Sequence, residues 1–255
     1  MLRFSANLSL LFRELPLRER LGAACAHGFA AVEIQLPYEL PARVLADAAA
    51  DAGLPIVLIN APLGPDARAP GMACRPEHGD AFRAALERAA DYAAALRVPC
   101  VNVLAGPATP EERSGCLELL AERLALAAEL LAPAGAQALL EPINPLDVPS
   151  YCVQSFEIAA QVLAATDPRV GLQFDIYHAG RMGLEPAQVF AKERARIAHI
   201  QFADCPGRHE PGTGRVPFAE LFAAIKRSDY RGWVGAEYHP AAATVEGLGW
   251  LRQFS

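Results

Sequence analysis

Four polar residues stand at the ends of strand-like apolar runs in the second half of the chain. Glu141 ends the run in ALLEPIN, Asp175 that in GLQFDIYH, Gln201 that in IAHIQFAD and Glu237 that in WVGAEYHP. Three carboxylates and an amide that converge on one point can hold a hard divalent cation. Two of the carboxylates would remain able to move a proton. This set of residues predicts an enzyme.

Strand-like and helix-like segments alternate along the whole chain and must position these four residues. The strand-like segments cover 2–9, 31–37, 55–64, 98–106, 136–144, 169–178, 196–204 and 232–240. The helix-like segments cover 17–28, 41–53, 78–98, 110–135, 155–166, 186–195 and 217–228, and a short one ends the chain. Eight such units favour an α/β fold, a (β/α)8 TIM barrel that forms a single domain over residues 1–255.

Strand ends in the first half of the chain also have polar residues. Because side chains alternate along a strand, Glu141 shares a face with Leu139, and Gln201 with His199. Asn7, Glu33, Asn60 and Asn102 lie near the ends of the earlier strands. If these faces point inward, the polar groups line the carboxyl-terminal mouth of the barrel, where such barrels place their chemistry.

Composition excludes several classes of protein. The chain is 53% hydrophobic with a mean hydropathy of +0.16, so it can bury a large core. A net charge of −6 disfavours nucleic acid as a partner. There is no charged leader before an apolar core and no apolar run of roughly 18 residues, so we expect a cytoplasmic protein without a membrane partner. The six cysteines form no C-x-x-C pair, which predicts free thiols.

Several long segments resemble one known family. LRFSANLS, ALLEPIN, QFDIYH, HIQFADCPGRHEPGTG and GWVGAEYHP are similar to the hydroxypyruvate isomerase family within the xylose isomerase-like barrels, and the resemblance covers nearly the whole chain. It implies an enzyme of glyoxylate metabolism that interconverts hydroxypyruvate and tartronate semialdehyde by proton transfer through an enediolate, without nicotinamide. Glu141 and Glu237 correspond to the two glutamates that act as base and acid, in an order that the resemblance leaves open.

The resemblance also implies a cofactor. A divalent metal, Mg²⁺ or Mn²⁺, would be held by Glu141, Asp175, Gln201 and Glu237, since oxygen ligands favour these ions. Related sugar epimerases have histidine where Gln201 stands. An amide binds metal more weakly than imidazole does, so a strict metal requirement stays open.

Three further residues are candidates for contact with a small hydroxy-oxo acid substrate. His178 corresponds to a substrate-contacting histidine, Arg208 could clamp the substrate carboxylate, and Asp147 could position the substrate or tune Glu141. The alternatives are a solvated loop histidine, a surface arginine and a plain loop aspartate. His199 is expected to be a satisfied core histidine.

Other functions are left open by the sequence. A four-carbon 2-oxo acid (2-oxo-tetronate) isomerase would use the same chemistry, and Pro70 stands where relatives tend to have arginine, with Arg68 and Arg75 nearby, so substrate choice could differ. A metal-dependent nuclease of the same superfamily and a noncatalytic sugar-acid binding barrel are the alternatives from other classes. The sequence does not decide whether the chain forms a homo-oligomer.

Overall fold

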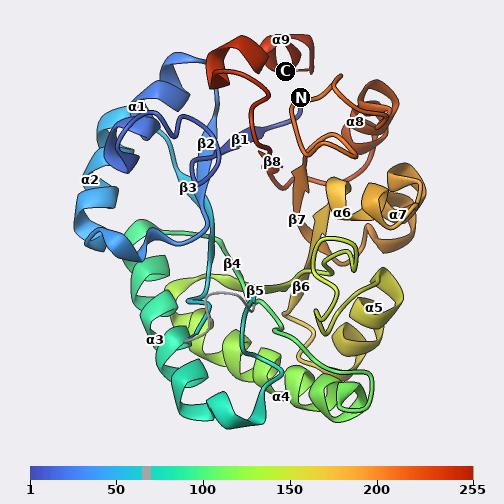
Figure 1. Ribbon diagram of the computed structural model, residues 1–255. Helices are drawn as coiled ribbons and strands as arrows, with labels where there is room; N and C mark the ends of the chain where they lie inside the picture. Colours follow the sequence, from blue (N-terminus) through green and yellow to red (C-terminus); the bar gives the residue numbers. More distant parts are fainter. Residues whose placement is uncertain (65–69, 255) are drawn as a thin grey trace. The chain divides into compact units, whose positions relative to one another are not determined.

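Eight parallel strands form the sheet of the computed structural model, which describes residues 1–64 and 70–254. They are hydrogen-bonded in chain order and close into a barrel (Figure 1). This confirms the predicted (β/α)8 fold. Their bounds are β1 Phe4–Asn7, β2 Ala31–Ile34, β3 Ile56–Asn60, β4 Cys100–Asn102, β5 Gln137–Leu140, β6 Gly171–Asp175, β7 Ile197–Phe202 and β8 Val234–Ala236.

Helices occupy the connections between the strands. They are α1 Leu17–Ala26, α2 Ala42–Ala52, α3 Gly79–Leu96, α4 Arg113–Leu131, α5 Phe156–Ala165, α6 Ile176–Arg181, α7 Pro186–Glu193, α8 Phe218–Arg227 and α9 Gly249–Phe254. Short 3-10 turns cover Pro37–Glu39, Pro76–His78, Ala132–Ala134 and Thr244–Gly247. None of the helices in the described part of the chain combines the length and apolar character needed to cross a membrane.

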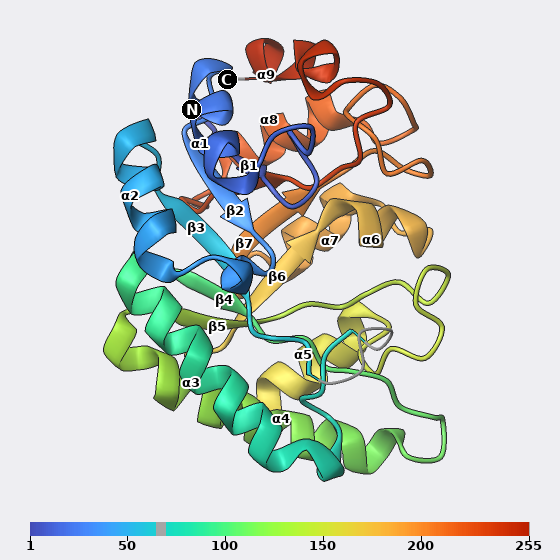
Figure 2. The same cartoon turned by 60° about the vertical axis from the view of Figure 1, so that its left-hand side comes forward.

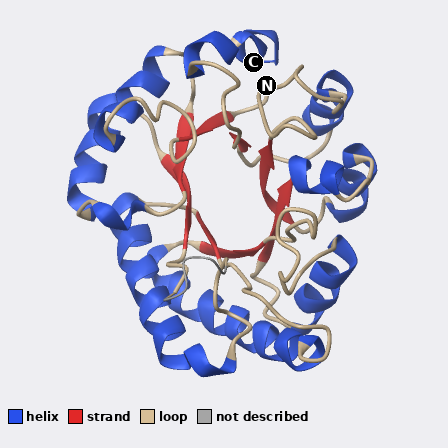
Figure 3. Cartoon of the chain, in the orientation of Figure 1, coloured by secondary structure: helices blue, strands red, loops and turns tan. Residues whose placement is uncertain are grey.

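By their contacts the residues fall into two compact units. One comprises Met1–Val57 and Phe174–Ser255, and the other Leu58–Gln173. In the first unit β1 pairs with both β2 and β8, and β8 pairs with β7, all in parallel. In the second unit β4 pairs with β3 and β5, and β5 with β6. Within each unit the helices cover one face of the strands (Figure 3).

An aromatic cluster forms much of the core of the first unit. The Phe202 ring lies 5.1 Å from that of Trp250 and 5.3 Å from that of Phe222, and Phe4 lies 5.2 Å from Trp250. Trp250 also donates a hydrogen bond from Nε1 to the Tyr238 hydroxyl at 3.1 Å. Edge-to-face contacts of this kind add to the burial of large apolar rings. These contacts hold α8 and α9 against β1 and β7, the two neighbours of β8.

The core of the second unit is covered by two long helices. In Figure 2, α3 and α4 run side by side. Arg123 of α4 is 8% exposed and donates to the main-chain carbonyls of Met72, Ala73 and Arg75 at 2.7–3.1 Å, and to that of Pro76 at 3.4 Å. A buried guanidinium thus fastens the loop after β3 to a helix.

Most predicted strands end several residues early in the structure, so that Glu141 and Glu237 follow β5 and β8 instead of lying within them, and two boundaries have an identifiable cause. The strand predicted over 169–178 ends at Asp175, because the Asp175 carboxylate accepts a hydrogen bond from Tyr177 N at 2.8 Å and caps helix α6. The helix predicted from 110 begins at Arg113. Before this helix, Glu112 Oε2 accepts a hydrogen bond from Thr109 N, and Thr109 Oγ1 accepts one from Glu112 N. These two bonds close a separate turn.

Candidate active site

Glu237 follows β8 directly and is only 5% exposed. Its Oε2 accepts from Arg208 Nη2 at 2.8 Å, and its Oε1 accepts from Gln35 Nε2 at 2.5 Å and from Asn7 Nδ2 at 3.5 Å. Burial raises the pKa of Glu237, Arg208 opposes this effect, and the charge of Asp175 adds to it. A buried carboxyl group with a raised pKa is suited to proton transfer near neutral pH.

Asp175 and His178 lie together at the junction of β6 and α6. They are 1% and 4% exposed, and His178 Nε2 lies 3.5 Å from Asp175 Oδ2. Arg208 Nη2 lies 3.9 Å from the same Oδ2 atom. The alternative of a solvated loop histidine at position 178 is therefore wrong, because the helix that starts after Asp175 buries this side chain.

Gln201 and His199 of β7 both contact a buried glutamate of β2. Glu33 Oε1 lies 2.8 Å from His199 Nε2, and Glu33 Oε2 accepts from Gln201 Nε2 at 2.8 Å. His199 is 1% exposed, which confirms the prediction of a satisfied core histidine. Gln201 is equally buried.

Arg208 lies on the loop that follows β7. This loop is ordered around the buried Asp204, whose carboxylate accepts hydrogen bonds from the main-chain N–H groups of Cys205, Gly212 and Val216 at 2.8–3.1 Å. Arg208 has a backbone φ of +57°, and its guanidinium stacks 4.8 Å above the Tyr177 ring. Its ion pair with Glu237 shows that it is not a plain surface arginine.

Glu141 follows β5 in the second unit and is 5% exposed. Its Oε2 accepts from Asn102 Nδ2 at 2.7 Å, so the end of β4 orients it. Tyr151 is fully buried nearby and accepts from Ala105 N at 2.9 Å. Burial raises the pKa of Tyr151 and the charge of Glu141 adds to the shift, so the phenol stays neutral.

Asp147 lies in an exposed turn six residues after Glu141. Asn144 Nδ2 donates to Asp147 Oδ2 at 3.0 Å, and Asp147 N donates back to Asn144 Oδ1 at 2.9 Å. These two bonds are typical of an Asx turn, which is a local structural role.

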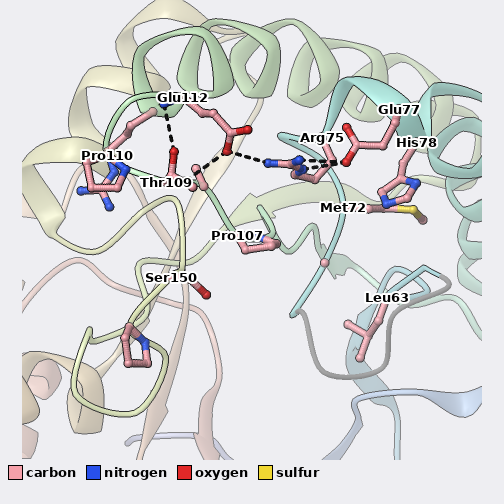
Figure 4. Close-up of a pocket in the computed structure, with 14 residues that line it drawn as sticks. Leu63, Met72, Arg75, Glu77, His78, Pro107, Thr109, Pro110, Glu112 and Ser150 are labelled. Atoms are coloured by element: carbon pink, nitrogen blue, oxygen red, sulfur yellow. Dashed lines mark hydrogen bonds and ion pairs between the residues drawn. The ribbon is translucent and has the colours of Figure 1, made fainter.

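A separate cavity of about 650 Å³ lies among the loops that follow β3, β4 and β5 (Figure 4). Arg75, which lines this cavity, stands between Glu77 and Glu112, with N–O distances of 2.9 and 3.0 Å. Glu77, followed by Glu112, raises the pKa of Arg75. Because both carboxylates already compensate this cation, it offers little to an acidic ligand. Arg68 lies outside the described residues.

The sequence analysis missed Gln35 as part of the site and did not predict the role of Glu33. Gln35 follows β2 and holds Glu237, and Glu33 holds Gln201. Their spacing of two residues places them on one face of the segment, a signal that was available. Glu33 was noted as a polar residue near a strand end, but its partners could not be read from spacing.

A closed barrel of eight parallel strands, with helices in the connections between them, defines the class of TIM-barrel proteins. Residues 21–254 match the model of the family described as "Xylose isomerase-like TIM barrel". The chain belongs to this family.

The chain is also similar to individual relatives over its whole length. It shares 38% identity with a 2-oxo-tetronate isomerase of Cupriavidus necator, in an alignment that covers 99% of this chain and 98% of the relative. It shares 37% identity with the hydroxypyruvate isomerase of Escherichia coli, over 98% of both. These names agree with the expected class of enzyme, an isomerase.

A solved structure from Brucella melitensis matches the whole fold. It has a TM-score of 0.95 and 36% identity, covers 100% of this chain and 99% of that one, and is described as an AP endonuclease of family 2. Relatives of one fold thus bear names from two classes of enzyme. The choice between them rests on the site.

Proposed function

We propose that this chain interconverts hydroxypyruvate and tartronate semialdehyde (2-hydroxy-3-oxopropanoate) by moving a proton between adjacent carbons through an enediolate. The observation that carries the proposal is the placement of two buried glutamates, Glu141 and Glu237, directly after β5 and β8. Parallel strands of a barrel end at the same mouth. Relatives named hydroxypyruvate isomerase and 2-oxo-tetronate isomerase support the same chemistry.

The two glutamates share the proton transfer in this proposal. One removes a proton from the carbinol carbon, the C–H electron pair forms the enediolate double bond, and a proton returns to the former carbonyl carbon. The carbinol hydroxyl loses its proton as the former carbonyl oxygen gains one. The raised pKa of Glu237 keeps it close to the range in which a carboxyl group can both give and take a proton.

The donor set fits a divalent cation. We propose Glu141, Asp175, Gln201 and Glu237 as the residues that would hold Mg²⁺ or Mn²⁺, because carboxylate and amide oxygens suit these ions. Glu141 and Asp175 also form, with His178, a buried group of a type that could hold a metal ion. When bound, the cation would polarise the substrate carbonyl and stabilise the negative charge of the enediolate.

The substrate carboxylate is assigned to Arg208. Arg208 bonds Glu237 through Nη2, and a guanidinium has five N–H donors, so it can bind a second carboxylate as well. His178 would contact the substrate hydroxyl groups. Asp147 would help to position the substrate only indirectly, by shaping the turn that it forms with Asn144. We place the enzyme in the cytoplasm, in keeping with its free cysteines, and expect neither nucleic acid nor membrane as a partner.

The deciding experiment is proton NMR of hydroxypyruvate with the purified enzyme in D₂O. We expect tartronate semialdehyde with deuterium on the carbon that receives the proton, and E141Q or E237Q should lower kcat by roughly 100- to 10,000-fold. E193Q, which alters an equally buried glutamate of α7, is the matched control and should retain turnover. Undiminished turnover in both E141Q and E237Q would refute the proposal. If the wild type converts neither hydroxypyruvate nor 2-oxo-tetronate, only a binding function is left.

The same assay with 2-oxo-tetronate separates the two isomerase activities. One additional carbinol changes pocket binding by about 1–3 kcal/mol, so the preferred substrate should have a kcat/KM roughly 10- to 200-fold higher. Treatment with EDTA should abolish turnover and Mn²⁺ should restore it.

A nuclease is the second candidate, because the related Brucella structure is described as one. A duplex with a single abasic site, incubated with the enzyme and Mn²⁺ or Zn²⁺, tests this activity. We expect no cleavage, since the chain has a net charge of −6 and a nuclease must attract phosphate.

A further inference from the structure

We propose that Glu33 turns the side-chain amide of Gln201 so that its carbonyl oxygen, and not its nitrogen, is available to a divalent cation. Glu33 takes no part in the proton transfer described above. It is a positioning residue that acts through Gln201. The inference deepens the proposed function and rests on it for the metal site.

Glu33 is a completely buried carboxylate surrounded by donors. Its exposed fraction is 0%. Oε1 accepts from Ser5 Oγ at 2.6 Å and lies 2.8 Å from His199 Nε2, while Oε2 accepts from Gln201 Nε2 at 2.8 Å and from Asn7 Nδ2 at 3.4 Å. An ionised carboxylate has only acceptor sites, and here each oxygen faces two donors.

This arrangement determines which end of the Gln201 amide faces Glu33. A carboxylate cannot donate a hydrogen bond, so the amide must turn its NH₂ group toward Glu33 and its carbonyl oxygen away. Hard cations bind amides through the oxygen. With Glu33 in place, Gln201 therefore presents the atom that such an ion requires.

Glu33 packs directly against the backbone of β8. A Cβ atom on Gly235 of β8 would lie 2.6 Å from Glu33 Cδ and 2.7 Å from Oε2, so the absence of a side chain at position 235 makes the space for this carboxylate. Gly235 is the register partner of both Ser5 and Gln201. Three strands thus hold Glu33 against Gln201. Partners that fix the orientation of a metal ligand typically change metal affinity 10- to 100-fold.

The variant E33M removes both acceptor oxygens of Glu33 at nearly the same side-chain volume. The Gln201 amide then has no carboxylate to hold its NH₂ group, so its carbonyl oxygen is no longer fixed toward the cation. The double variant E33Q/Q201E exchanges the two side chains and restores both the hydrogen bond and an oxygen ligand.

The test measures Mn²⁺ affinity without turnover, from the EPR signal of free Mn²⁺ titrated with full-length protein. We expect E33M to bind Mn²⁺ roughly 10- to 100-fold more weakly than the wild type, E33Q/Q201E to bind it about as tightly as the wild type, and E193Q to be unchanged. Q201M has nearly the same volume but no oxygen, and should also bind weakly. A merely structural role for Glu33 would lower stability and leave the affinity of folded protein intact.

The outcomes separate this inference from the proposed function. Wild-type Mn²⁺ affinity in folded E33M or in Q201M would overturn the inference, and so would a wild-type protein that isomerises hydroxypyruvate but binds no Mn²⁺. If circular dichroism shows that E33M is unfolded, Q201M and the double variant decide. A wild type that binds Mn²⁺ with the expected variant pattern but isomerises neither oxo acid would contradict the proposed function alone.

Discussion

Replacing Gly235 with alanine adds one methyl group at a point of β8 where the structure leaves no space. The new Cβ would lie within 2.7 Å of Glu33 Cδ and Oε2, closer than real Cβ contacts occur. Gly235 lies inside a buried strand, where alanine fits the backbone as well as glycine does. The methyl group can therefore be accommodated only if the Glu33 carboxylate moves.

The cost follows from the bonds that this movement breaks. Glu33 has three contacts of 2.6–2.8 Å, to Ser5, His199 and Gln201. Hydrogen bonds to a charged group are each worth about 1.5–3 kcal/mol, but bonds that share one acceptor do not add independently. Depriving a buried charge of its partners costs about 3–5 kcal/mol, and we expect G235A to lose roughly this much stability.

Urea denaturation of a double-mutant cycle tests this explanation. In an E33A background the carboxylate is gone, so G235A should cost less than about 1 kcal/mol there, giving a coupling energy of at least ~2 kcal/mol. G22A is the control, because a methyl group on Gly22 of helix α1 meets nothing within 4 Å and should stabilise by about 0.5–1 kcal/mol. An equal cost of G235A with and without Glu33 would refute the reasoning.

Further predictions concern pH, a loop and metal binding. Because the folded-state pKa of Glu237 is raised, its contribution to stability is complete below the unfolded pKa of about 4.5 and is lost as pH rises through the folded value. In EDTA-treated protein, urea curves from pH 5 to 8 should show the wild type losing stability relative to E237Q, and parallel pH profiles would contradict this. R123M should lower the free energy of unfolding by about 2–4 kcal/mol, since buried carbonyls of the loop after β3 lose their donor. R123K should recover only part of this stability in urea denaturation, and equal stability of R123M and wild type would exclude the role given to Arg123. Mn²⁺ at 100 times its Kd should stabilise the wild type by about 2.7 kcal/mol and Q201M by less, measured as the shift in Tm.

The sequence predicted the fold because the relevant signals are local. Alternating apolar runs and helix-like segments identify eight units, and a parallel sheet of that size closes most readily as a barrel. Errors arose where a side chain changes the local structure. Asp175 was read as part of a continuing strand, but its carboxylate starts a helix at Ile176 and thereby places His178 on that helix.

The site was predictable as a set of residues but not as a network. Position at or near the end of a strand-like run identifies Glu141, Asp175, Gln201 and Glu237 as candidates. It does not reveal that Glu33 and Gln35 of one segment each hold a different member of that set, because these contacts span more than 160 positions of the chain. Such partners depend on strand register, which a single sequence specifies only through the pattern of buried residues.

The left-handed backbone of Arg208 carries a strain that its ion pair outweighs. An arginine at a φ of +57° is strained by about 1–2 kcal/mol, whereas glycine or asparagine would be relaxed there. R208G or R208N would relieve this strain but would leave the buried Glu237 without its cation, a loss of about 3–5 kcal/mol. Efforts to raise the heat resistance of this scaffold should therefore leave Arg208 in place and begin with R97G, since Arg97 has the same backbone strain at the end of α3.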